Sequence, residues 1–445
     1  MRPCKLDCRI PAADGRAKNT SDHSALQTLR RMNDTMTSEH NVDIAILGAG
    51  MAGASLIHLL RPAREQGLTV ALIDRQALTE EQWSTDISQR PPSFDGRATA
   101  LSYGTQQLFD KLGLWSAMAP AACAIEHIQV SDQGRFGQAH LHAAEQQAPA
   151  LGYVIENGAL GQGLLANLEQ LDNVELFAPA EAEHVRMNAA GAELTFADGR
   201  KLQTQLLVMA DGGRSPLASQ LGIQQRRQDY GTHALVTQIE CDQPHRHWAY
   251  ERFSGDGPIA FLPLQQRCYA LVWTLSDDEI DDVKALDDET FLARLQQQMG
   301  MRLGRFIRVG ERLSYPLALV QSSEQVRRSL VLLGNAAHSL HPVAGQGFNL
   351  ALRDAAMLAE HINRAYASGD HVGDLALLQA YETQQQIDQR NTIVASDALP
   401  KVFGSNHSIM AFVRDAGLLA LAAAPTARRL FARHAMGLGQ RGARV

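Results

Sequence analysis

The stretch VDIAILGAGMAGASLIHLLRPAREQGLTVALID, from Val42 to Asp74, decides the fold. Its first part, Val42 to Leu47, is a short apolar run with β-branched residues, which predicts a buried parallel strand. A glycine loop, a helical stretch from Ala54 to Arg64 and a break at Gly67 follow, before a second apolar run from Leu68 to Ile73. This order within about thirty residues predicts a βαβ unit that binds a dinucleotide.

Each conspicuous residue of this unit has a physical task. We expect Gly48 to permit the tight turn, Gly50 to let the backbone approach a pyrophosphate, and Gly53 to allow close packing of helix on strand. The helix N-terminus directs free N–H groups at the phosphates. Asp74, about twenty residues further on, is placed to accept hydrogen bonds from the ribose hydroxyls of an adenosine. The alternative is a glycine-rich turn without a ligand.

The glycine pattern alone means little. Gly437, Gly439 and Gly442 also match it, yet no strand precedes them and the chain ends before a helix could follow. The prediction therefore rests on the flanking strands and helix.

Composition sets the class of the molecule. The 445 residues suggest about three domains, or two with an extension, and 45% hydrophobic with 20% charged residues is typical of a globular protein. The net charge of −7 argues against nucleic acid as a partner. No charge-free apolar run approaches the roughly 18 residues of a membrane span. The odd, scattered cysteines indicate no disulfide framework and fit a reducing cytoplasm, and we find no metal-ligand constellation.

The N-terminal segment 1–40 differs from the rest. It is polar, has no sustained apolar period and lacks the apolar segment of a secretory signal. We interpret it as a disordered or mis-assigned extension, since Met32 and Met36 lie just before the first strand.

Two later segments repeat the passage from strand to glycine-rich loop to helix. The first runs from Leu206 through DGGRS, which starts at Asp211 and continues with Gly212, into a helical stretch ending at Leu221. The second runs from Leu330 through GNAAHSLHPVAGQGFNLALRD, which ends at Asp354. Small residues at a helix start let backbone N–H groups reach a flat, partly anionic ligand.

These motifs together resemble the class A flavoprotein aromatic hydroxylases, of the p-hydroxybenzoate hydroxylase type. The segment DGRATAL from Asp95 to Leu101, with HPVAGQGFNL, is similar to the ubiquinone-biosynthesis hydroxylases, most closely those that act on 2-polyprenyl-6-methoxyphenol. The likeness runs from about Asn41 to the C-terminus. Asn335 departs from the pattern, because most members have an aspartate facing the ribityl chain; an amide keeps a hydrogen bond there without the charge.

The resemblance implies an α/β fold with a Rossmann-like FAD-binding domain, an interleaved β-sheet substrate domain and a helical C-terminus. We assign 41–115, 150–220 and 325–370 to the FAD domain, 116–149 and 221–324 to the substrate domain, and 371–445 to the helical region. The residues agree, since β-rich runs predict antiparallel strands: Ala234 to Glu240, Trp248 to Phe253, Ile259 to Leu264, and Tyr269 to Leu275. A strand from Glu311 to Leu317 then returns the chain to the FAD domain.

The resemblance also implies the site residues. Those expected to bind FAD are Gly48, Gly50, Gly53, Asp74, Arg97, Asp211, Gly212, Gly334, Asn335, Gly345, Gln346, Gly347 and Asn349. No catalytic residue is firm; the candidates are His338, His341 and Pro342, and the two histidines either orient the substrate hydroxyl or only fix the loop conformation. For Asn349, the alternative is a helix cap.

The expected chemistry belongs to the cofactor. NAD(P)H reduces FAD, O2 adds, and a flavin C4a-hydroperoxide delivers one oxygen to the ring of a polyprenylated (methoxy)phenol. There is no second GxGxxG unit for a nicotinamide, which fits a family in which NAD(P)H visits the flavin transiently. Hydroxylation of another aromatic substrate, an oxidase, a halogenase and a non-catalytic flavoprotein scaffold of a quinone-biosynthesis complex remain alternatives. A halogenase is disfavoured because the tryptophans are isolated.

The last segment has a distinct charge pattern. From Ala416 to Val445 there is no acidic residue, while five arginines stand among leucines and Phe431. Such a cationic, apolar segment suits an anionic membrane surface, which predicts peripheral contact with the inner membrane, or another ubiquinone-biosynthesis protein. The alternative is that these leucines pack on the FAD domain.

Overall fold

The computed structural model describes residues 39–78, 97–134, 137–166, 168–254, 257–340, 345–403 and 424–438. The chain divides into a unit of Met1–Glu39 and a unit of His40–Val445, and the second is described below. Several predicted features lie outside the described residues: nearly all of the 1–40 extension, the first two residues of DGRATAL, His341, Pro342, and residues 416–423 and 439–445 of the C-terminal segment.

The first sheet has eight strands in the order β18-β19-β11-β1-β2-β8, with the hairpin β9–β10 attached to β11. The pairing β1–β2 is parallel, as predicted for the βαβ unit, and the pairings β2–β8 and β11–β19 are parallel as well. Its strands are β1 (Glu39–Leu47), β2 (Val70–Ile73), β8 (Val174–Phe177), β9 (Ala182–Asn188), β10 (Gly191–Phe196), β11 (Lys201–Met209), β18 (Val326–Arg327) and β19 (Leu330–Leu332).

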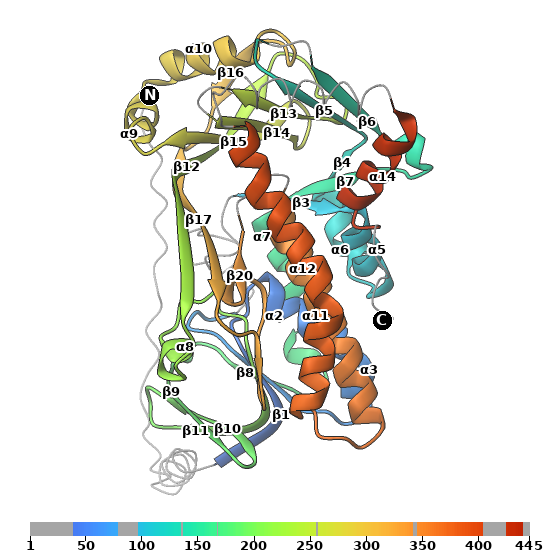
Figure 1. Ribbon diagram of the computed structural model, residues 1–445, viewed down its shortest axis with the longest axis vertical. Helices are drawn as coiled ribbons and strands as arrows, with labels where there is room; N and C mark the ends of the chain where they lie inside the picture. Colours follow the sequence, from blue (N-terminus) through green and yellow to red (C-terminus); the bar gives the residue numbers. More distant parts are fainter. Residues whose placement is uncertain are drawn as a thin grey trace, which may run out of the picture. The chain divides into compact units, whose positions relative to one another are not determined.

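This sheet is buried on both faces, which explains its continuous apolar runs. Ile44 and Ile46 point into a core with the helices, whereas Ala45 and Leu47 point into a core with the β9–β10 hairpin and α8. The helices associated with the first core are α2 (Met51–Leu59), α3 (Arg61–Arg64), α5 (Tyr103–Lys111), α6 (Trp115–Met118), α7 (Asn157–Leu165), α11 (Gln346–Ala367) and α12 (Leu375–Phe403); α8 spans Leu217–Gln220. Figure 1 shows α11 and α12 side by side.

The second sheet has nine strands, in the order β20-β17-β12-β15-β14-β13-β5-β6, with β16 on β12. Its pairings are antiparallel except for β13–β5. Its strands are β5 (His127–Asp132), β6 (Gln138–His142), β12 (Gln225–Cys241), β13 (Trp248–Ser254), β14 (Gly257–Pro263), β15 (Cys268–Ser276), β16 (Phe306–Val309), β17 (Leu313–Ser322) and β20 (His338–Ser339). The helices α9 (Ile280–Ala285) and α10 (Asp288–Met299) cover one face.

The predicted antiparallel strands are confirmed, with differences of length in β12 and β17; β17 runs from Leu313 to Ser322 rather than from Glu311 to Leu317. β12 begins nine residues before the predicted start, at Gln225, because it continues as a ribbon with β17. The added residues, QRRQDYGTH, are mostly polar, and their side chains are largely solvent-accessible. Pairing with β17 holds a segment that apolar periodicity alone marks as a loop.

A third sheet connects the two large ones. β3 (Ala98–Ser102) and β4 (Cys123–Ile125) both pair with β7 (Gly152–Glu156). Val154 and Ala98 pack against Ala249 and Ala270 of the second sheet. The predicted fold class is confirmed, while the division into domains stays a prediction.

The described end of the chain is helical. α14 (Pro425–Ala435) packs on β6 and the short helix η4 (Ala143–Gln146) through Ala432 and Met436. In the described part of the chain, no helix has the length and apolar character needed to cross a membrane.

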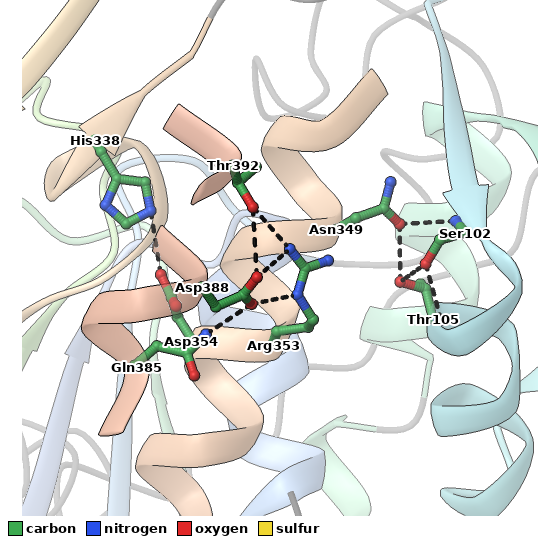
Figure 2. A network of polar contacts seen from close by, with 9 residues as sticks. All are labelled: Ser102, Thr105, His338, Asn349, Arg353, Asp354, Gln385, Asp388 and Thr392. Atoms are coloured by element: carbon green, nitrogen blue, oxygen red, sulfur yellow. Dashed lines mark hydrogen bonds and ion pairs between the residues drawn. The ribbon is translucent and has the colours of Figure 1, made fainter. Parts of the chain in front are cut away.

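We predict that Asp388→Asn destabilises the fold by about 3 kcal/mol, because it leaves a largely buried arginine without its counter-ion. Asp388 is 5% exposed and accepts hydrogen bonds from Arg353 of α11, at 2.6 and 3.3 Å (Figure 2). Chemical unfolding followed by circular dichroism measures the loss. Glu65→Gln is the matched control: its partner Arg61 is exposed, so we expect a change within about 0.5 kcal/mol. Equal effects in both variants would contradict the prediction.

Candidate active site

The loop after β1 leaves no room for side chains. Gly48 has a φ of +103°, and a Cβ there would lie 2.7 Å from the carbonyl oxygen of Ala210. A Cβ on Gly53 would collide with the carbonyl oxygen of Gly48. Gly50 begins α2 with no side-chain cap, and no acidic residue lies in the first turn. The N–H groups of that turn are therefore left for an anionic ligand.

Asp74 holds this loop in shape. Its Oδ2 accepts a hydrogen bond from the Ala49 N–H at 2.8 Å, and its Oδ1 accepts one from the Gln76 N–H at 2.9 Å. A carboxylate has about four lone-pair sites, so these contacts leave capacity for ribose hydroxyls. The binding of adenosine by Asp74 remains a prediction.

Two further loops meet the first one. Asp211 follows β11, and its carboxylate accepts hydrogen bonds from the N–H groups of Gly213 and Ser215, at 3.0 and 2.8 Å. Gly212 has a φ of +73°, and a Cβ there would lie 3.9 Å from the Cβ of Asn335. The structure thus brings Asp211, Gly212 and Asn335 together, as the sequence predicts. Loops after neighbouring strands meet because they leave the same edge of the sheet.

The N-terminus of α11 completes the group of loops. Gly334 has a φ of +61°, and a Cβ there would lie 3.3 Å from the Ala52 Cβ and 3.4 Å from the Ala351 Cβ. Gly345 precedes α11 in the left-handed conformation and lies against Ala100. Gln346 and Gly347 start the helix, and the space beside Gly347 is open.

Asn349 has its side chain occupied by the protein. Its Oδ1 accepts hydrogen bonds from the Ser102 N–H and the Thr105 hydroxyl, both at 2.8 Å. Its Nδ2 donates to the carbonyl oxygens of Ala100 and Gly345, at 2.9 and 2.8 Å. Figure 2 shows the amide turned toward Ser102 and Thr105. These bonds tie α11 to β3 and α5, so the geometry favours a structural role over direct contact with the flavin.

His338 likewise has a partner inside the protein. Its Nε2 lies 3.1 Å from Oδ2 of Asp354 on α11, with the side chains 7% and 0% exposed (Figure 2). On β20, His338 pairs with Gln321 of β17. The histidine therefore connects α11 to the second sheet, which favours fixing of the loop over orientation of a substrate. Sequence alone did not identify Asp354 as its partner, because the two residues belong to separate elements.

Arg97 lies between the sheets. Its guanidinium is 4.6 Å from the ring centroid of Tyr315 on β17. Its own carbonyl oxygen accepts a hydrogen bond from the Asn157 N–H at 2.7 Å. The predicted contact of Arg97 with FAD stays a prediction.

The chemistry of this site fits FAD. Three glycine-rich loops and two uncapped helix starts gather backbone N–H groups, and a side chain would collide at Gly48 and Gly53, which suits a pyrophosphate and a flat ring. Gly48, Gly50 and Asp74 would hold the adenosine and pyrophosphate end. Gly345 to Gly347 would lie at the ring.

Sequence reasoning missed one cluster of metal-ligating residue types, formed by Cys123, His245 and His247. The hydrogen bonds argue against a metal there. The Nδ1 of His245 accepts from the His247 N–H, so the proton is on the Nε2 that faces the thiol; Nδ1 of His247 faces the Ala124 carbonyl oxygen and must donate. Burial also raises the pKa of the Cys123 thiol to about 11. The Cys123 thiol and the Nε2–H of His245 would each have to lose a proton to bind a metal.

Comparison with known proteins agrees with this site. Residues 41–393 match the model of the FAD binding domain family. The chain is 36% identical to the ubiquinone hydroxylase UbiL of Rhodospirillum rubrum, over 91% of each chain, and 30% identical to the ubiquinone hydroxylase UbiM of Neisseria meningitidis, over 81% of this chain and 77% of that one. The solved structure of p-nitrophenol 4-monooxygenase PnpA from Pseudomonas putida has the same fold, with a TM-score of 0.72, 16% identity, and coverage of 91% of this chain and 100% of that chain.

The chain is therefore a flavoprotein of the FAD-binding-domain family. Within that family it belongs to the FAD-dependent hydroxylases of ubiquinone biosynthesis.

We predict that Gly50→Val yields a folded but colourless protein, because the added side chain would stand in the path of the pyrophosphate. The visible absorbance of bound flavin and chromatography of the released cofactor measure the loss, and the wild type should release FAD rather than FMN. Gly310→Ala is the control and should stay yellow, because Gly310 is exposed, its backbone is outside the left-handed region, and a Cβ there would make only ordinary contacts, the nearest at 3.6 Å. A yellow Gly50→Val protein with full flavin content would contradict the assignment of this loop.

Proposed function

We propose that this protein is an NAD(P)H- and O2-dependent monooxygenase that hydroxylates the aromatic ring of a ubiquinone precursor. The observation that carries the proposal is its 36% identity to a ubiquinone hydroxylase over nine-tenths of both chains. The arrangement of the glycine loops supports it, because the site can hold a dinucleotide and a ring without any metal or nucleophile. When bound, FAD supplies the oxygen-transfer chemistry. The protein positions the substrate ring beside the cofactor and excludes water from the site.

The protein's own residues divide this work between them. The loops at Gly48, Asp211 and Gly334 bind the cofactor through backbone N–H groups. The third sheet contacts both the second sheet and the N-terminus of α11, and we place the flat substrate on the part of the second sheet that faces this junction. Holding the substrate ring close to the cofactor in a fixed orientation, with water excluded, lowers the activation barrier of the oxygen transfer.

We further propose that the substrate is a polyprenylated methoxyphenol. Support comes from the residues 97–101 of the DGRATAL segment, which include β3 beside the α11 N-terminus, and from the membership in this family. Ring hydroxylation of a different aromatic compound is one alternative. A non-catalytic scaffold protein is another, and it would keep its function when Gly50→Val removes the flavin.

Cells that lack the protein should stop making ubiquinone and accumulate a prenylated phenol that lacks one oxygen on the ring. Mass analysis of the quinone fraction of a deletion strain tests this expectation, and the wild-type gene should restore ubiquinone while the Gly50→Val gene should not. Normal ubiquinone without an accumulated phenol would exclude this substrate class.

We also propose that α14 contacts an anionic membrane that carries the apolar substrate. The helix docks through Ala432 and Met436, and Arg428 forms an ion pair with Glu145 at 2.9 Å. On its outer side, Leu430 and Phe431 are 65% and 46% exposed. The exposed Arg429 and Arg433 stand beside them. An apolar pair flanked by arginines suits an anionic lipid surface.

Replacement of Leu430 and Phe431 by serine should weaken co-sedimentation with vesicles of anionic phospholipid, since each buried apolar side chain contributes about 1.5–3 kcal/mol. Salt should weaken the binding of the wild type. The control is Met301→Ser, which removes an apolar side chain that is 62% exposed elsewhere on the surface. Equal sedimentation of all three proteins at low salt would refute a membrane role for α14.

A further inference from the structure

The second sheet has a covered face and an inner face. Trp273 and Phe291 belong to the core under α9 and α10, and Tyr250 of β13 packs against that core. Successive side chains of a strand point to opposite faces, so Ala249 and Glu251 lie on the other side, which we call the inner face. The packing of Ala249 in a separate core confirms this direction.

The inner face lies next to the proposed flavin site. Ala249 shares a core with Ala98 of β3. Ala100, two residues further along β3, lies against Gly345 at the start of α11. A second contact joins the same regions, because Gln238 of β12 donates a hydrogen bond to Glu156 of β7 at 3.0 Å.

Glu251 lies in a row of small apolar residues on this face. Its neighbours across the sheet are Val130 on β5 and Ala260 on β14, and Ala260 in turn pairs with Val272 of β15. None of these side chains can donate a hydrogen bond. The carboxyl group of Glu251 therefore has no hydrogen-bond donor among these three strand neighbours.

The carboxyl group of Glu251 is half-buried and has no counter-ion among the described residues. Burial raises the pKa of this carboxyl to about 7. A carboxylate in that position is destabilising unless a donor reaches it, so a ligand that brings an O–H group would offset the cost.

We propose that Glu251 accepts the phenolic proton of the substrate and thereby activates the ring. This inference rests on the proposed function. The phenolic O–H bond breaks, the proton goes to a carboxylate oxygen of Glu251, and the electron pair stays on the ring oxygen. The carbon ortho or para to that oxygen becomes electron-rich and takes up one oxygen atom of O2; the other oxygen atom leaves as water, with NAD(P)H as reductant.

The proton then returns. The hydroxylated ring loses the proton of its C–H bond, and Glu251 gives the held proton back to the phenolate oxygen. Phenol, O2, NAD(P)H and one proton thus become the hydroxylated phenol, water and NAD(P)+. Only the ionised form of Glu251 can take the proton, so hydroxylation should rise with pH through about 7.

Other ionisable groups face the same region. Asp132 lies on the inner face beside Phe253, and Glu240 lies at its far edge, where Arg267 and Arg308 pair with it. Glu156 is bound by Gln238, as described above. Arg97 and Tyr315 contact each other at the β17 side. Of these carboxyl groups, Glu251 is the one whose neighbours on both adjacent strands, Val130 and Ala260, are apolar.

The test compares FAD-loaded wild type, Glu251→Gln and Glu251→Asp, with a short-chain prenylated methoxyphenol as substrate. Product formed per bound flavin is measured from pH 5.5 to 9 (about 1.5–2 units around the expected pKa). We expect Glu251→Gln to lower kcat about 10²-fold or more, with a smaller change of KM and loss of the rise near pH 7. Glu251→Asp should restore a pH-dependent rate in part. Glu240→Gln, whose carboxyl is on the same face but ion-paired, is the control and should keep the wild-type profile.

A second measurement uses only the wild-type protein, so it does not depend on the folding of a variant. The O-methyl ether of the same substrate has no proton to give, so the wild type should hydroxylate it slowly and without the rise near pH 7. An undiminished kcat and pH profile for Glu251→Gln, or a wild-type profile that is the same for phenol and ether, would overturn the role of Glu251. If instead the yellow wild type forms no hydroxylated product from any prenylated phenol, the proposed function itself fails.

Discussion

The close approach of Gly48 to the end of β11 is the contact on which the rest of the site depends. A Cβ on Gly48 would come within 2.7 Å of Ala210 and Asp211, so only glycine lets the first loop lie against the second. Asp74 keeps the first loop in place, and Asp211 shapes the second because its carboxylate accepts a hydrogen bond from the Gly213 N–H. The result is a surface made of main chain, which can approach a phosphate more closely than any side-chain surface.

The second requirement is to place a strand face opposite that surface. The third sheet meets it, because β3 packs on the inner face through Ala98 and on α11 through Ala100. Asn349 locks this junction with four hydrogen bonds to three elements of the fold. An ion-pair contact between His338 and Asp354 joins α11 to the second sheet. The buried polar groups near the site therefore serve mainly to fix its walls.

The local sequence pattern was enough to predict the βαβ unit, the three loops and the antiparallel strands, because each shows a short run of apolar residues or a glycine-rich segment at its end. It was not enough for contacts between distant segments. Asn349 looked like a flavin ligand or a cap, yet its amide is used by residues about 250 positions away. Glu251 carried no sequence signal, since one acid in a strand is common; its importance emerges only when Val130 and Ala260 are seen beside it.

The central claim is that this fold holds FAD in order to put one atom of O2 on a phenol ring. The most direct measurement supplies the yellow protein with NAD(P)H, a prenylated methoxyphenol and 18O2, and weighs the product by mass spectrometry. We expect one labelled oxygen atom per molecule of product. Formation of product without label, or consumption of NAD(P)H with peroxide as the only product at saturating phenol, would contradict it.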